Sequence, residues 1–227
     1  MKPFPKLNRL KDFVIVFIRY GLASFIPGPI FSMTGIRKET EKGVKYKDMS
    51  VGKRLRLAME ELGTTFIKFG QLLSLHEDVV SDEIAEELKK LQDEIHPLPL
   101  EKINPVIENN FPGGIGTVFS EFKETPLASA SISQVYEARL RAEDEEVVIK
   151  IRKPGVVEKV QQDIDILFFV ADIMNKRSFL ADHIDLVDLV EEFHEIMKEE
   201  LDLKHEAKNI RNFRKNFSNE EWKNIVA

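Results

Sequence analysis

Three short segments follow one another closely in the sequence: TVFSEFKE (117–124), SQVYEARL (133–140) and VVIKIRK (147–153). The first two alternate apolar and polar residues and the third is compact and β-branched, which is typical of strands. The charged segment RAEDEE (141–146) is typical of a turn between the last two. Together they predict a three-stranded antiparallel meander.

Helical patterns precede these strands. Ser50 is suited to cap a helix that is interrupted at Gly63, and a second apolar pattern of helical spacing covers residues 66–75. Ser81 is suited to begin a third helix, and the proline-punctuated segment 96–105 leads into a short one. The N-terminal half of the chain is therefore expected to be helical.

Helical patterns also follow the strands, over residues 156–176 and 184–217. The second pattern is long, and we expect the helix to be bent or broken. The order of helices, three antiparallel strands and helices again predicts an α+β fold.

The composition allows one ordinary domain, or one domain with a substantial extension, in 227 residues. Hydrophobic residues make up 43% and charged residues 32%, so a real core is expected. The chain has no cysteine, which excludes disulfides, thiolate metal sites and cysteine nucleophiles. The net charge of −6 argues against nucleic acid as a partner.

The charge is unevenly distributed along the chain. Residues 1–60 carry 13 Lys/Arg and 5 Asp/Glu, whereas residues 61–227 carry 20 and 34. A basic front end on an acidic body suggests an anionic surface as partner, and a membrane is the obvious one.

The basic front end contains an amphipathic segment. Residues 13–31 are the most apolar stretch, but a charge and two prolines make it marginal as a membrane span of about 20 residues. Basic residues alternate with apolar ones as in a helix that lies in a membrane interface. These residues are Lys2, Lys6, Arg9, Lys11 and Arg19 with Leu7, Leu10, Phe13, Val14, Phe17 and Ile18. The alternative is a helix that packs on the body of the protein.

Lys150 ends the apolar run of the third predicted strand. A lysine in that setting usually extends its amine to solvent. In kinase-type folds the same setting holds the lysine that binds the α- and β-phosphates of a nucleotide, aimed by a glutamate on a following helix. Both interpretations fit this short pattern.

The connection between the first two strands is rich in small residues, namely Ala128, Ser129, Ala130 and Ser131. In ordinary kinases this hairpin is glycine-rich, so that its backbone can approach phosphate. Alanine and serine still permit close approach and require less unusual backbone angles. A plain hairpin loop is the alternative.

Two helical motifs complete the set. Lys68 and Gln71 lie three residues apart on one helical face, and the glycine between them suggests close packing or a bend. Asp202 and Glu206 lie four residues apart on one face of an acidic helix, and one of these carboxylates could meet Lys150. Taken singly, an exposed polar pair and a solvated acidic face are the simpler interpretations.

Together, in this order and spacing, these features resemble the UbiB/ADCK (AarF-type) family of atypical, protein-kinase-like proteins. The resemblance covers about residues 50–217. It rests on four motifs: LGTTFIKFGQLLS (62–74), PLASASISQVYEARL (126–140), EEVVIKIRKPGV (145–156) and EELDLKHEAKNIRNF (199–213).

The resemblance implies a helical N-terminal extension followed by a partial kinase-like N-lobe. Residues 1–49 would be a basic, membrane-proximal segment and linker. Residues 50–115 would be the helical extension with the Lys-x-Gly-Gln motif, and residues 116–227 the incomplete N-lobe.

The resemblance also assigns roles to residues. Lys150 would be the nucleotide lysine and Glu206 its helix partner, with the alanine-rich loop at Ala128, Ser129, Ala130 and Ser131 beside the nucleotide. Lys68 and Gln71 would belong to the extension that folds over the site where a protein substrate would otherwise sit. Glu200 and Asp202 would form the Glu-x-Asp pair, with Lys68 ion-paired to Glu200.

Family membership would imply ATP or ADP with magnesium as cofactors, and ATPase or atypical kinase activity in ubiquinone or other isoprenoid-lipid biosynthesis. The expected partners are an anionic membrane surface and a quinone or isoprenoid lipid or biosynthetic proteins. The expected location is peripheral, on the cytoplasmic face of a membrane.

The chain departs from the family pattern in one serious respect. It contains no catalytic-loop His-Gly-Asp or His-Arg-Asp and no Asp-Phe-Gly, so the magnesium ligands and the C-lobe are absent from this sequence. Ser133 and Thr64 are milder departures. We therefore expect little or no catalysis by this chain alone.

Two other functions fit the same sequence. The chain could be a natural truncated product that acts as a non-catalytic membrane adaptor or regulator and pairs with a C-lobe in trans. Apolar surface exposed by its unfinished N-lobe would favour a partner or self-association. It could also be a helical lipid-binding module whose kinase resemblance is only ancestral.

Overall fold

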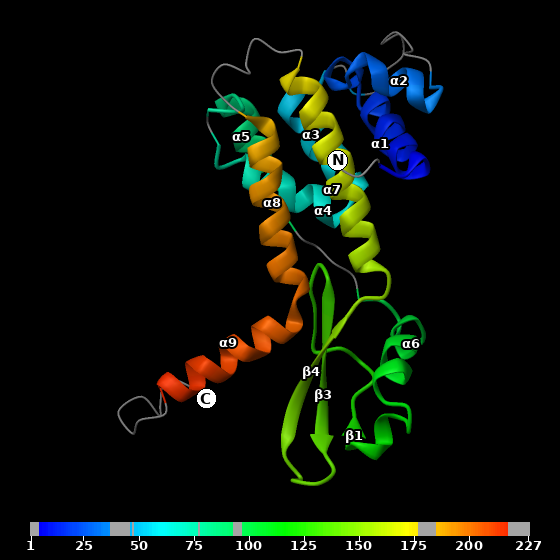
Figure 1. Cartoon of the computed structure of the whole chain (residues 1–227), viewed down its shortest axis with the longest axis vertical. Helices are drawn as coiled ribbons and strands as arrows, with labels where there is room; N and C mark the ends of the chain where they lie inside the picture. The colour runs from blue at the N-terminus through cyan, green and yellow to red at the C-terminus, as the bar shows by residue number, and fades with distance from the viewer. Residues whose placement is uncertain are drawn as a thin grey trace. The chain divides into compact units, whose positions relative to one another are not determined.

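The computed structural model describes residues 5–36, 46, 48–76, 78–92, 97–176 and 185–217. Within these residues the order of elements is helices, a small antiparallel sheet and helices again (Figure 1). This confirms the predicted α+β fold. The chain forms two compact units: unit 1 comprises Met1–Ile95 and Val157–His194, and unit 2 comprises His96–Val156 and Glu195–Ala227.

Unit 1 is helical. It contains α1 (Leu7–Arg19), α2 (Gly28–Thr34), α3 (Val51–Leu62), α4 (Thr64–Leu73), α5 (Asp82–Leu88), nearly all of α7 (Val156–Asn175), the first part of α8 (Leu186–Leu201) and the 3-10 turn η1 (Ala23–Phe25). Ser50 caps α3 as predicted, because its hydroxyl accepts a hydrogen bond from Lys53 N at 3.3 Å. Gly63 separates α3 from α4 with a positive φ of 101°.

Helix α1 packs inside unit 1. Its apolar residues Leu10, Phe13, Val14, Val16 and Phe17 are buried, and the rings of Phe13 and Phe66 lie 5.8 Å apart. Most of the apolar side chains considered for a membrane interface therefore contact protein here, which is the packed alternative, although Leu7 is 47% exposed. Lipid contact by this segment stays a prediction, and Lys2 lies outside the described residues.

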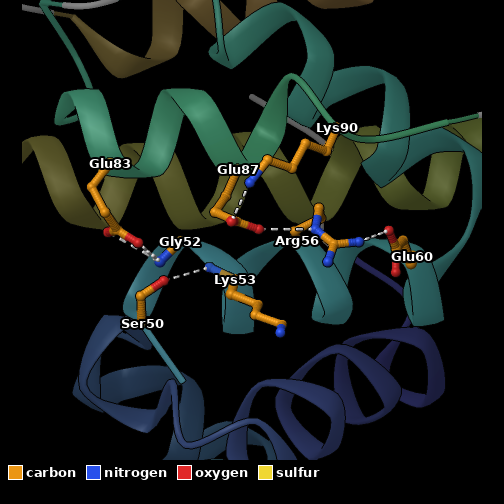
Figure 2. Close-up of polar contacts among 8 residues, drawn as sticks. All are labelled: Ser50, Gly52, Lys53, Arg56, Glu60, Glu83, Glu87 and Lys90. Atoms are coloured by element: carbon orange, nitrogen blue, oxygen red, sulfur yellow. Dashed lines mark hydrogen bonds and ion pairs between the residues drawn. The ribbon is translucent and has the colours of Figure 1, made fainter. Parts of the chain in front are cut away.

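Helices α3 and α5 meet along a polar seam (Figure 2). The N–H of Gly52 points at the Glu83 carboxylate, 3.3 Å from each oxygen. Arg56 donates to Glu87 at 3.2 Å and to Glu60 at 2.6 Å. The Glu83 carboxylate, at the N-terminus of α3, also suits the positive end of its helix dipole.

Gly52 is the point of closest approach in this seam. A Cβ atom at position 52 would lie 2.9 Å from the Glu83 carbonyl oxygen and 3.0 Å from Ile84 Cα. Both of these are backbone atoms, which cannot move aside without separating the two helices. The seam therefore requires glycine at this position.

Replacing Gly52 with alanine should lower the free energy of unfolding by about 1–3 kcal/mol, since the added methyl overpacks a helix–helix contact. Thermal and urea unfolding followed by circular dichroism measure the change. Gly116→Ala is the matched control, because nothing lies within 4 Å of its Cβ position, and it should be neutral or slightly stabilising. Equal stability of the two variants would contradict the close approach.

Unit 2 holds the sheet, α6 (Leu100–Asn110), the 3-10 turn η2 (Ile115–Thr117) and α9 (Leu203–Asn216). The strands are β1 (Phe119–Phe122), β2 (Ala128–Ser129), β3 (Ser133–Leu140) and β4 (Glu146–Arg152). β3 is central: β4 pairs antiparallel along one edge, while β1 and β2 pair with opposite ends of the other edge. The predicted meander is thus present as β1, β3 and β4, and the short β2 lies in the segment predicted to connect the first two strands.

One face of the sheet carries the core of unit 2. Tyr136 on β3 and Ile151 on β4 form a cluster with Ile103 and Ile107 of α6, and the Phe122 ring stacks on Tyr136 with centroids 5.2 Å apart. Figure 1 shows α6 beside the sheet. The opposite face is open, since Val148 is 63% exposed. Alternation along β3 and β4 therefore separates a packed face from a face available for binding.

The long C-terminal helix is broken, as predicted. α8 ends at Leu201 and α9 begins at Leu203, with Asp202 between them as the N-cap. The boundary between the two units falls within α8, and α7 is grouped with the N-terminal helices. Each compact unit thus combines segments from separate parts of the sequence. The domain boundaries predicted at residues 49 and 115 instead divide the chain into consecutive segments.

Candidate nucleotide-binding site

Lys150 lies on the open face of the sheet and forms an ion pair with Glu206. Lys150 Nζ donates to both carboxylate oxygens, at 2.7 Å each, from β4 to α9. The two side chains are 37% and 44% exposed, so the pair is worth little to stability. What it does supply is a fixed direction for the ammonium.

Strand register identifies the neighbours of Lys150. Val135 on β3 lies opposite Lys150, and Ala128 on β2 lies opposite Val135. Val148, two residues before Lys150, lies on the same face of β4. An exposed apolar surface therefore adjoins an ammonium group, which suits a ligand with a flat apolar part and an anionic part.

Neither Val135 nor Val148 was among the residues singled out from the sequence. Counting two residues at a time from Lys150 would have found Val148. Finding Val135 requires the pairing register, which depends on contacts between strands.

The alanine-rich loop joins β2 to β3. Ala128 and Ser129 form β2, and Ala130 N donates to Ser133 O at 2.9 Å to close the tip. Among the described residues the one non-glycine with positive φ is Asp144, outside this loop. Alanine and serine therefore adopt the loop conformation without the strain that would demand glycine.

Lys153 contacts this loop and was missed by sequence reasoning. Its Nζ donates to Ala130 O at 2.8 Å and its backbone N donates to Ile132 O at 2.8 Å. Lys153 is 9% exposed, and burial lowers the pKa of its ammonium. Ile149 and Ile151 are apolar, and position 153 follows them at the same two-residue spacing. This alternation was a signal in the sequence that Lys153 points to the packed face.

Asp202 is the N-cap of α9, and of the two carboxylates considered for Lys150 it is Glu206 that pairs with it. Asp202 Oδ1 accepts hydrogen bonds from Lys204 N and His205 N, at 3.0 Å each, and so caps α9. These backbone donors, that of His205 foremost, lower the pKa of the Asp202 carboxyl. The helix begins after Asp202, so the four-residue spacing does not make it a second partner for Lys150.

The Lys-x-Gly-Gln motif lies on α4 in unit 1. Gln71 Nε2 donates to Leu91 O at 3.0 Å, and a Cβ on Gly70 would lie 2.5 Å from both Leu91 Cδ1 and Met59 Sδ. The close packing suggested by the glycine is thus present. Lys68 belongs to unit 1 and Glu200 to unit 2, and their ion pair stays a prediction.

Two features are absent from the residues that the structure describes. These residues contain no group of three or more His, Asp or Glu side chains placed to hold a metal ion. Over the same residues, no helix combines the length and apolar character needed to cross a membrane.

A strand lysine aimed by a helix glutamate, on the open face of a small antiparallel sheet, defines a kinase-like N-lobe. Residues 90–225 match the family model of the ABC1 atypical kinase-like domain. The chain belongs to this family, which confirms the family resemblance inferred from its four motifs.

Curated relatives cover most of the chain. A protein of Marinobacter nauticus named "Probable protein kinase UbiB" is 34% identical over 226 residues, covering 94% of this chain and 40% of the relative. A Pseudomonas putida protein of the same name is 42% identical over 177 residues, covering 78% and 33%. The chain thus spans 33% to 40% of the length of these two relatives.

A solved structure of a similar protein covers part of the chain. It shows a Mycobacterium tuberculosis protein in complex with erythromycin, with 31% identity, a TM-score of 0.47 and coverage of 71% of this chain and 41% of that one.

Proposed function

We propose that this chain is the nucleotide-binding part of an ATP-dependent atypical kinase or ATPase. The observation that carries the proposal is the Lys150–Glu206 ion pair on the sheet face that exposes Val148. Glu206 orients the ammonium toward the place where phosphates would lie, and Val148 offers an apolar surface to the base. ATP, when bound, supplies a transferable phosphoryl group.

The residues fit a nucleotide better than they fit a metal ion. Phosphoryl transfer needs magnesium held against the β- and γ-phosphates and a positioned nucleophile. The described residues offer the ammonium group of Lys150 and no cluster of metal-ligating side chains. We therefore propose that this chain by itself binds nucleotide without turning it over.

Lys150→Met is the first test of this proposal. The unaltered 227-residue protein should bind ATP and ADP with dissociation constants on the order of 1 mM, seen as saturable backbone shifts in ¹⁵N spectra. Losing a hydrogen bond between charged groups should weaken binding about 10- to 100-fold. The measurement is a nucleotide titration of both proteins.

Lys123→Met is the matched control, because Lys123, directly after β1, is also an exposed lysine paired with a glutamate, Glu137. Its loss should leave ATP affinity within about twofold. Equal ATP affinity in Lys150→Met, or no ATP binding by the unaltered protein, would refute the proposal. Magnesium-dependent ATP turnover abolished by Lys150→Met would instead refute its non-catalytic part.

The family setting extends the proposal to a membrane-associated role in ubiquinone or other isoprenoid-lipid biosynthesis. The strongly basic segment 1–60 supports contact with anionic lipid. Because the apolar face of α1 is buried in unit 1, we propose a peripheral contact made by basic side chains.

A non-catalytic adaptor is the second candidate. The observation that favours it is α9, on which Ile210 and Phe213 are 60% and 53% exposed and no residue is buried. Such a surface suits a protein partner, or a second copy of this chain. Salt-sensitive binding to anionic liposomes without nucleotide binding would favour this function over the first.

A further inference from the structure

The tip of the alanine-rich loop, residues 130–133, is anchored from one side by a single residue. Lys153 donates its backbone N–H to Ile132 O and its side-chain Nζ to Ala130 O, both at 2.8 Å. The Ile132 side chain is itself buried, at 5% exposure. The loop tip is therefore held at two of its carbonyls, those of Ala130 and Ile132.

Lys153 approaches the tip from the packed face of the sheet. Along the end of β4, Ile151 is buried, Arg152 is exposed and Lys153 is buried again. Lys153 thus continues the strand alternation and lies on the Ile151 side, opposite Lys150. Two lysines three residues apart flank the same loop region from opposite faces.

The bond to Ala130 O sets the direction of the next amide. In a trans peptide the C=O and the following N–H point in opposite directions, because the six atoms of the unit are coplanar. With Ala130 O directed toward Lys153 on the packed face, Ser131 N–H is directed toward the open face that carries Lys150. A backbone N–H held on that face is a donor suited to phosphate oxygens.

Burying the Lys153 ammonium costs free energy, because the charged group loses its contact with water. Lysine is almost never fully buried unless it is paired, and here burial lowers the pKa of the ammonium. The hydrogen bond to Ala130 O compensates part of this desolvation. A positive charge beneath the loop also raises the local potential felt by an anion above it.

We propose that Lys153 is a positioning residue for phosphate recognition: by holding Ala130 O on the packed face, it orients the Ser131 N–H toward the nucleotide phosphates. This proposal rests on the proposed function and adds a second phosphate-directed element to Lys150. Lys153 acts through the loop backbone, and its own ammonium stays on the opposite face from the ligand.

The test compares Lys153→Met with the unaltered 227-residue protein in ¹⁵N titrations with ATP and with adenosine. ATP affinity should fall about 5- to 10-fold, the worth of one backbone hydrogen bond, while adenosine shifts at Val148 stay unchanged. Lys153→Arg keeps a cationic donor and should restore ATP affinity. Hydrogen exchange of the Ser131 amide, measured without nucleotide, should be faster in Lys153→Met.

Each outcome bears on one of the two proposals. Unchanged ATP affinity in Lys153→Met, with ATP bound by the unaltered protein, overturns the positioning role and leaves the proposed function standing. Equal losses for ATP and adenosine would mean general loosening of the sheet and would also overturn it. If no form binds ATP, the proposed function fails. In that case, unchanged hydrogen exchange of the Ser131 amide in Lys153→Met also refutes the anchoring of the loop by Lys153. Faster exchange of that amide would uphold the anchoring alone.

Discussion

Replacing Arg9 with methionine should lower the free energy of unfolding by about 3–5 kcal/mol, because it leaves a buried carboxylate without its counter-charge. Arg9 Nε donates to Asp163 Oδ1 at 2.6 Å, and Asp163 is fully buried on α7. Arg9 also donates from Nη2 to Leu62 O at 2.8 Å, where α3 ends. A single side chain thus joins α1, α3 and α7.

Urea unfolding followed by circular dichroism measures this loss, and a double variant tests its cause. Arg9→Met combined with Asp163→Leu removes both charges, and stability should return to about that of the unaltered protein or exceed it. Arg19→Met is the control on the same helix, since its ion pair with Glu61 is exposed, and it should cost less than about 1 kcal/mol. Arg9→Met as mild as Arg19→Met would contradict the argument.

The Arg9–Asp163 pair also bears on how the N-terminal segment could meet a membrane. The side chains of α1 that would enter a lipid interface are the ones that pack beside this pair in unit 1. A membrane-bound state that used them would have to break the pair and expose a buried carboxylate. The pair therefore ties α1 to α7 in the state that the structure describes.

Local sequence patterns predicted the elements well. Period-two alternation identified the strands, and a capping serine with a following glycine marked the ends of α3 at Ser50 and Gly63. Lys150 was recognisable because it ends an apolar strand. Each of these signals lies within a few residues of chain, where backbone preferences act directly.

Contacts between distant segments were beyond those patterns. Arg9 and Asp163 are 154 residues apart, and each is an ordinary charged residue on an amphipathic helix. In the sequence Lys153 is an ordinary basic residue after a strand, and only the structure shows its contact with the tip of the loop. Only the family resemblance singled out Glu206 among its neighbouring carboxylates as the partner of Lys150. Spacing along one continuous helix could not do so, because the helix breaks at Asp202.

Gln134 is a buried residue whose replacement should have a comparably large effect. It lies on β3 with no exposed surface and exchanges hydrogen bonds with one residue before α6. Its Oε1 accepts from Leu98 N at 2.8 Å, and its Nε2 donates to Leu98 O at 3.2 Å and to the Tyr136 hydroxyl at 2.8 Å. This amide therefore serves two backbone groups and a buried phenol.

Gln134→Leu should lower the free energy of unfolding by about 3–5 kcal/mol, because each buried polar group left unpaired costs about 1–3 kcal/mol. Gln161→Leu is the control, since Gln161 is exposed and bonds only Asp165 one turn along its own helix, and it should cost less than about 0.5 kcal/mol. Urea unfolding gives both values.

Native-state hydrogen exchange should also locate the damage from Gln134→Leu. Leu98, Gln134 and Tyr136 all belong to unit 2, so amides of β3 should exchange faster while amides of α3 in unit 1 keep their protection. The opposite faces of β3 carry Gln134 and Val135, so the same variant should also disturb the surface beside Lys150. Uniform acceleration in both units would show instead that they unfold as one, and that the open face of the sheet depends on the whole chain for its order.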